Sequence, residues 1–141
     1  MHLCVYQNCP LAQAVVHAHP PTAIALTMAF PDWQELPNDC LSELVLALGR
    51  LPIAPFARPG TQAMGEVLKP FLPDHRAILL ARHGAIAWGE SLEEALWGIE
   101  RLEHTAKILH QALQLGPLTK LPAEEMAALQ KLREKIGPRT F

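Results

Sequence analysis

The most regular pattern of apolar and polar positions in this chain covers residues 91–115, where apolar side chains recur at helical spacing. Ser91-Leu92-Glu93-Glu94 opens the stretch with a capping-box signature, and Gly116-Pro117 follows its end. We therefore predict one long amphipathic helix. Its apolar face is expected to contain Leu92, Ala95, Leu96, Ile99, Leu102, Ala106, Leu109 and Leu113.

Shorter patterns predict the remaining elements. Val15 and Val16 favour extended structure, and Pro20 and Pro21 end it, although a proline is tolerated in the first turn of a following helix. Strands are expected at residues 13–18, 51–57, 77–81 and 85–88, the second of them at a sheet edge because prolines interrupt it. Helices are expected at residues 2–8, 21–29, 41–49, 61–68 and 122–136.

Length and charge narrow the class of protein. A chain of 141 residues is expected to form one domain, residues 1–141. Its formal net charge of −2 and scattered lysines and arginines argue against a nucleic-acid-binding protein, which usually shows a clustered basic surface. Half of the residues are apolar and only 18% are charged, which predicts surface reserved for other subunits, unless a large core lowers the charge instead.

Two further features predict a cytoplasmic protein without a membrane anchor. The N-terminus lacks a basic region followed by an apolar run, and charges and prolines interrupt the most apolar tract, residues 41–57. Cys4, Cys9 and Cys40 form no Cys-x-x-Cys pair, so we expect reduced thiols that serve as small apolar residues.

Three histidines carry the candidate chemistry. Alternate residues of a strand point to the same face, so His17 and His19 can reach one ion if residues 14–18 are a strand, and His83 can be a third ligand. Three protein ligands plus water are typical of a catalytic zinc site. A His-x-His pair alone is weak support, because most such pairs are surface or core residues. Gly84 after His83 allows either a close backbone approach to a metal or substrate or a plain turn or bulge.

The residues around these histidines resemble a known family. The metal-binding stretch of the class II aldolase/adducin family is similar to Gln13-Ala14-Val15-Val16-His17-Ala18-His19-Pro20-Pro21. A second stretch resembles the same family, Ala77-Ile78-Leu79-Leu80-Ala81-Arg82-His83-Gly84-Ala85-Ile86-Ala87-Trp88-Gly89. The long helix also looks like this family where it contains Glu100-Arg101-Leu102-Glu103-His104. The resemblance covers residues 1 to about 116, with matching order and spacing.

The resemblance implies a fold, a cofactor and a reaction. The fold is α/β, a three-layer α/β/α sandwich with a mainly antiparallel sheet, assembled as a homotetramer. His17, His19 and His83 would hold a divalent ion, with Zn²⁺ first because imidazole suits it, and Mn²⁺, Fe²⁺ or Co²⁺ as alternatives. The implied reaction is retro-aldol cleavage of a sugar or sugar phosphate through a metal-stabilised enediolate.

The chain also departs from the family pattern. Family enzymes carry a metal-adjacent glutamate, used as a general acid/base, and a phosphate-binding Gly-Asn-x-Ser region, both before the first histidine of the pair. Counting back from His17 to the glutamate runs off the start at Met1, so the resemblance covers only the C-terminal two-thirds of the family domain, and the catalytic residue is unknown. We expect impaired catalysis.

Other functions and other histidines were weighed beside this one. The alternatives are a catalytically inactive metal-binding protein, an adducin-like assembly protein, and a sugar-phosphate dehydratase or epimerase of the same family. A cupin is disfavoured because residues 20–26 supply no glutamate after the His-x-His pair. His104 and His110 are expected to be exposed or structural and His75 solvated, whereas His2 could approach the metal.

Overall fold

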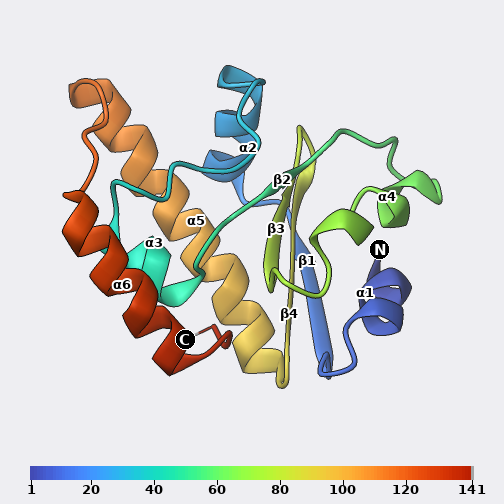
Figure 1. Ribbon diagram of the computed structural model, residues 1–141. Helices are drawn as coiled ribbons and strands as arrows, with labels where there is room; N and C mark the ends of the chain where they lie inside the picture. Colours follow the sequence, from blue (N-terminus) through green and yellow to red (C-terminus); the bar gives the residue numbers. More distant parts are fainter. Residues whose placement is uncertain (141) are drawn as a thin grey trace.

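The computed structural model describes residues 1–140, which form a four-stranded sheet with helices on both faces (Figure 1). The strand order is β1-β4-β3-β2. β1 with β4 and β4 with β3 are antiparallel, while β2 and β3 are parallel. The sheet is therefore mainly antiparallel, as expected. The strands are β1 (Ala14–Ala18), β2 (Ile53–Ala54), β3 (Ala77–Leu80) and β4 (Gly84–Gly89).

Each expected helix is present, although two are shorter than the pattern predicted. The helices are α1 (His2–Asn8), α2 (Pro21–Ala29), α3 (Ser42–Ala47), α4 (Ala63–Glu66), a 3-10 turn (Lys69–Phe71), α5 (Leu92–Leu115) and α6 (Ala123–Ile136). α4 ends early, and the chain continues into the 3-10 turn that contains Pro70. In the described part of the chain, no helix has both the length and the apolar character that a bilayer crossing requires.

The strands alternate between two apolar layers. In β3, Ala77 and Leu79 face the cluster formed with α2, α3 and α5, whereas Ile78 and Leu80 face the cluster formed with α1 and α4. Period-two side-chain alternation in a strand covered on both faces gives this arrangement. The α/β/α layering that the resemblance implied is confirmed.

The long helix α5 begins as its sequence signature predicts. The Ser91 hydroxyl accepts a hydrogen bond from the Glu94 backbone N–H at 3.2 Å. The expected apolar face is only partly buried. Ala95, Ile99 and Leu102 lie in the core, but Leu92 and Leu96 are 62% and 45% exposed. The predicted helix is confirmed, and these two leucines of its apolar face are exposed in the described chain.

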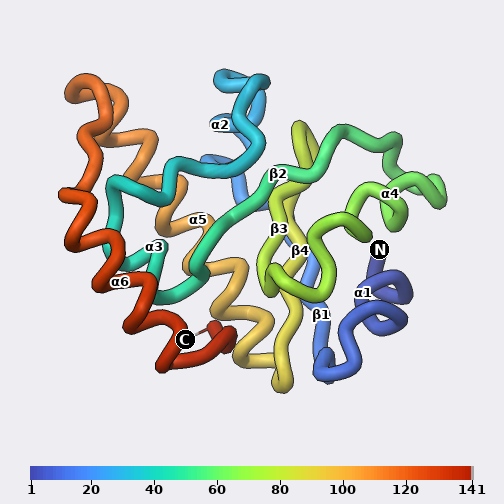
Figure 2. Tube along the Cα trace, in the orientation of Figure 1, coloured from blue at the N-terminus to red at the C-terminus, as the bar shows by residue number. Residues whose placement is uncertain are grey.

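A buried ion pair joins α5 to the sheet and to the C-terminal segment. Arg76 donates to Glu94 at 2.6 Å and to Glu90 at 3.0 Å, and its guanidinium lies 4.6 Å from the ring centroid of Trp88. The Thr140 backbone N–H donates to Glu94 at 3.1 Å. The last described residues therefore return to the first turn of α5, a path that Figure 2 traces.

Candidate metal centre

The three candidate histidines converge in the structure. His17 lies in β1, His19 lies one residue beyond its end, and His83 lies in the turn between β3 and β4. One ring nitrogen from each lies within 4.8 Å of the others, and no carboxylate joins this group among residues 1–140. The ring centroids are 4.9 to 5.2 Å apart.

Antiparallel pairing brings the two histidine segments together. β1 pairs with β4 so that His17 lies opposite Ile86 and Ala18 opposite Ala85. This register places the end of β1 beside the turn that carries His83. The preceding residue, Arg82, adopts the left-handed conformation with φ of 59°, which is uncommon for a residue other than glycine. The His83 backbone N–H donates to the Leu80 carbonyl at 3.0 Å and closes the turn.

Gly84 is required by a close approach rather than by a turn. A Cβ atom at this position would lie 2.5 Å from the Ala18 carbonyl oxygen, 2.8 Å from His19 Cδ2 and 3.2 Å from His17 Cε1. Any side chain would displace the β1 backbone and both imidazoles. Gly84 therefore makes a close backbone approach to β1 and to the two imidazoles, while an approach to a metal or substrate stays a prediction.

The protonation of the imidazoles suits a cation. His17 Nδ1 lies 2.8 Å from the Ala85 carbonyl oxygen, so this nitrogen carries the proton and Nε2 keeps its lone pair. His83 Nδ1 is buried without a hydrogen-bond partner in the described structure. Burial lowers the pKa of both His17 and His83, and the neighbouring imidazoles lower it further. Three imidazole nitrogen donors fit a divalent ion of the zinc type.

The buried histidines make the stability of the metal-free protein depend on pH. The pKa of His17, His75 and His83 is lowered in the folded protein, in each case chiefly by burial. Below their unfolded pKa of about 6.5, the unfolded chain binds more protons than the folded one, so the free energy of unfolding should fall as pH decreases from 7 towards 5. Urea unfolding in the presence of a chelator measures this.

A matched variant isolates one contribution to that pH dependence. His75→Gln should make the slope shallower, whereas His110→Gln, on the exposed side of α5, should leave it unchanged. A free energy of unfolding that stays constant or rises between pH 7 and pH 5.5 would contradict the prediction.

The remaining histidines lie outside the trio. His2, His104 and His110 are exposed. His75 is half-buried rather than solvated as the sequence predicted, because its carbonyl accepts the indole N–H of the buried Trp88 at 2.9 Å. Cys4 and Cys9 are buried free thiols, as expected, and burial raises the pKa of Cys9 to about 11.

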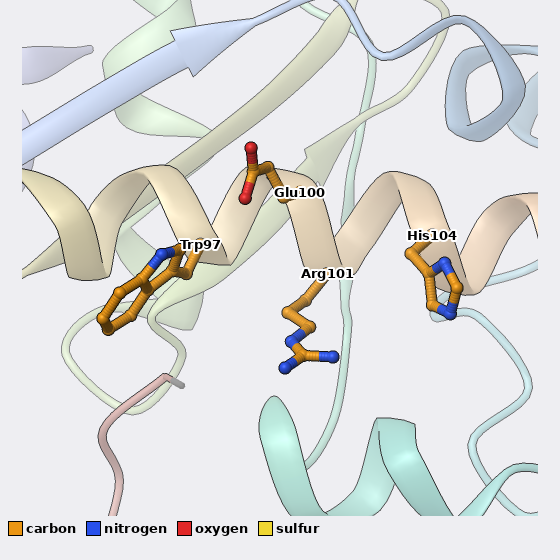
Figure 3. A pocket seen from close by; sticks show the side chains of 4 residues that line it. All are labelled: Trp97, Glu100, Arg101 and His104. Carbon is orange, nitrogen blue, oxygen red and sulfur yellow. The ribbon is translucent and has the colours of Figure 1, made fainter.

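Cavities along α5 border the trio. One of about 420 Å³ is lined by His19, Glu100, Glu103, His104 and Lys107, among others. Glu100 and His104 also line a second cavity, with Trp97 and Arg101. Figure 3 shows Glu100 on one side of the helix and Arg101 on the other. The sequence analysis named Glu100 and Glu103 only as part of the family resemblance of the long helix and gave them no role, and it did not name Lys107.

Comparison with known proteins finds relatives among decarboxylases and aldolases. The family described as "Class II Aldolase and Adducin N-terminal domain" matches residues 1–110. A 3-oxo-tetronate 4-phosphate decarboxylase of Escherichia coli strain K12 is 36% identical over 130 residues, which are 92% of this chain and 61% of that protein. An L-fuculose phosphate aldolase of Escherichia coli O157:H7 is 31% identical over 141 residues, 98% of this chain and 63% of that protein.

Solved structures agree. The crystal structure of YgbL from Escherichia coli, described as a putative aldolase/epimerase/decarboxylase, superposes with a TM-score of 0.79 at 36% identity, over 92% of this chain and 62% of that one. An L-fuculose 1-phosphate aldolase also gives a TM-score of 0.79, at 29% identity, over 94% of this chain and 61% of that one. The chain thus spans about three-fifths of the length of these relatives.

Proposed function

This chain belongs to the Class II Aldolase and Adducin N-terminal domain family, and on that premise we propose that it is a metal-dependent lyase that breaks a carbon–carbon bond in a sugar phosphate or a sugar-acid phosphate. The convergence of three imidazoles within 4.8 Å carries the proposal. Assembly without catalysis, the adducin-like alternative, gives no reason for such a group.

His17, His19 and His83 would hold the ion, with Zn²⁺ as the first candidate and Mn²⁺, Fe²⁺ or Co²⁺ as alternatives. When bound, it would supply Lewis-acid stabilisation of the negative charge that develops on the substrate as the carbon–carbon bond breaks. The Ala85 carbonyl fixes the orientation and tautomer of His17, and Gly84 leaves room for both imidazoles of the pair.

Decarboxylation is the better-supported reaction. In a 3-oxo acid the carboxylate leaves as CO₂, its bonding electrons pass to the neighbouring ketone, and a proton is needed only afterwards, at carbon. Retro-aldol cleavage also requires a base that removes a hydroxyl proton as the bond breaks. The similarity to a 3-oxo-tetronate 4-phosphate decarboxylase at 36% identity supports decarboxylation.

Retro-aldol cleavage, the reaction that the sequence resemblance implied, is the second candidate. A 5-deoxy-D-ribulose 1-phosphate aldolase of Bacillus thuringiensis is 35% identical over 138 residues, 97% of this chain and 62% of that protein. The two reactions share the stabilised product anion and differ in the leaving group.

The 141-residue polypeptide should therefore release CO₂ from 3-oxo-tetronate 4-phosphate in a metal-dependent reaction. Cleavage of L-fuculose 1-phosphate should be slower than CO₂ release, because it also needs a base that removes the hydroxyl proton, a contribution that is typically about 10²–10⁴-fold. A coupled assay with and without a chelator measures both. Faster aldol cleavage than decarboxylation, or CO₂ release that survives chelation, would refute the assignment.

We also propose that the chain self-associates, as the tetrameric family architecture implied. Leu92, Leu96 and Trp97 are exposed along the first turns of α5, and Leu3 and Leu11 are exposed at and after α1. Apolar surface of this kind is commonly buried between subunits. Light scattering at micromolar concentration should give a mass well above 15.6 kDa. The double substitution Leu92→Lys, Leu96→Lys should lower the mass, and a clean wild-type monomer would contradict the proposal.

A further inference from the structure

The helix α2 directly follows the segment that carries His17 and His19 and contacts the turn that carries His83. His19 lies two residues before its first residue, Pro21, and Figure 1 shows α2 beside the turn between β3 and β4. α2 contacts β3, β4 and α5. The position of this helix therefore affects both ligand segments at once.

A carboxylate from α5 holds the N-terminus of α2. The first turn of a helix has backbone N–H groups without partners inside the helix, and the N-cap residue here, Pro20, offers no side-chain acceptor. Glu103 fills this role. Its two oxygens accept from the Thr22 backbone N–H at 3.2 Å, the Ala23 backbone N–H at 3.1 Å and the Thr22 hydroxyl at 2.7 Å. The Glu103 side chain is 14% exposed.

The same helix holds the turn that carries His83. Thr27 is buried, at 3% exposure. Its hydroxyl donates to the Ile24 carbonyl at 2.8 Å and accepts from the Arg82 backbone N–H at 2.9 Å. Arg82 has the left-handed backbone conformation and directly precedes His83. The Thr27 hydroxyl thus stabilises the backbone conformation that sets where His83 lies.

We propose that Glu103 and Thr27 are positioning residues of the metal centre, which hold α2 so that His19 and His83 reach the same ion. Neither side chain belongs to the imidazole trio. Each acts on a ligand through a backbone N–H group, Glu103 at the start of the helix that follows His19 and Thr27 at the residue before His83. This inference rests on the proposed metal site and adds to it the residues that arrange it.

Metal affinity of matched variants tests the proposal. Glu103→Gln keeps the shape but replaces one acceptor oxygen with an amide that faces an N–H group. Thr27→Val keeps the volume but loses the hydroxyl. Each should weaken Co²⁺ and Zn²⁺ binding about 10-fold, the lower end of the range for groups that orient metal ligands. Thr27→Ser, which keeps the hydroxyl, should bind as the wild type does.

Glu100→Gln is the control for charge. Glu100 lies on α5 within the same cavity as Glu103 and His19, and its side chain is exposed. Its substitution removes one negative charge near the trio without touching α2, so metal affinity should stay within about twofold. An equal loss in Glu100→Gln and Glu103→Gln would show that charge, not position, is responsible, and would overturn the proposal.

Two readouts separate positioning from general destabilisation. The visible absorption of bound Co²⁺ reports coordination geometry, so it should change in Glu103→Gln and Thr27→Val and stay the same in Glu100→Gln. The metal-induced rise in unfolding temperature, measured for each variant against its own metal-free form, corrects for any loss of stability. Wild-type affinity and spectrum in both Glu103→Gln and Thr27→Val would refute the inference, whereas failure of the wild type to bind metal would refute the proposed function itself.

Discussion

Replacing His83 by alanine is expected to weaken divalent-metal binding by more than about 100-fold, and the same result is expected for His17→Ala and His19→Ala. The binding free energy of a protein zinc site is about 10 kcal/mol, so each of three imidazoles accounts for roughly 3 kcal/mol. A loss of that size raises the dissociation constant by more than about 100-fold. The remaining pair of imidazoles would hold an ion only weakly. Metal content after dialysis and titration calorimetry measure the loss.

Two exposed histidines provide the control for that experiment. His104→Ala and His110→Ala change two exposed histidines of α5 that lie outside the trio, and both variants should retain about one ion per chain. The proposed metal centre would be wrong if all three trio variants kept wild-type metal content. If only one of the three variants kept it, the ligand set would be wrong while a metal site would remain.

Replacing Glu94 by alanine should lower the free energy of unfolding by about 3–5 kcal/mol, the usual loss when one partner of a buried ion pair is removed. Arg76 and Glu94 have side-chain exposures of 5% and 7%, so neither charge is solvated in the folded protein. Without Glu94, Arg76 keeps the more exposed Glu90 as its carboxylate partner among the described residues, and the backbone N–H groups of Glu90 and Thr140 lose their acceptor. Urea unfolding followed by circular dichroism measures the change.

The double substitution Arg76→Met, Glu94→Leu shows whether unpaired charge causes the loss. It removes both charges and should destabilise the protein less than either single substitution. Glu100→Ala, on the exposed side of the same helix, should change the free energy of unfolding by no more than about 0.5 kcal/mol. A decrease in the free energy of unfolding of less than about 1 kcal/mol in Glu94→Ala would contradict the prediction. It would mean that water replaces the carboxylate.

The elements that could be predicted are those with local signals. β1 follows from Val15 and Val16 and ends before Pro20, and α5 begins at the Ser91 cap. The histidine trio could be proposed because strand periodicity and the family resemblance pointed to the same residues. The structure confirms that the trio converges, while bound metal remains a proposal.

The remaining features depend on contacts between distant residues. The hydrogen bond from Thr22 to Glu103 joins positions 81 apart, and the one from Arg82 to Thr27 joins positions 55 apart. Neither leaves a periodic or compositional trace in the sequence. The capping box was predicted only in part. The Ser91 hydroxyl accepts from the Glu94 backbone N–H as predicted. The Glu94 carboxylate, however, accepts from Arg76 and from the Glu90 backbone N–H.

The pairing of β1 with β4 would couple binding of the proposed ion to the long-range part of the fold. β3, β4 and α5 are consecutive in the chain, so a fragment that contains them needs little loop closure to form. Of the trio, that fragment holds only His83, and the N-terminal fragment with β1 and α2 holds only His17 and His19. High-affinity binding of the proposed ion would therefore require the long-range β1–β4 register. An ion bound there would stabilise the whole sheet rather than one local segment.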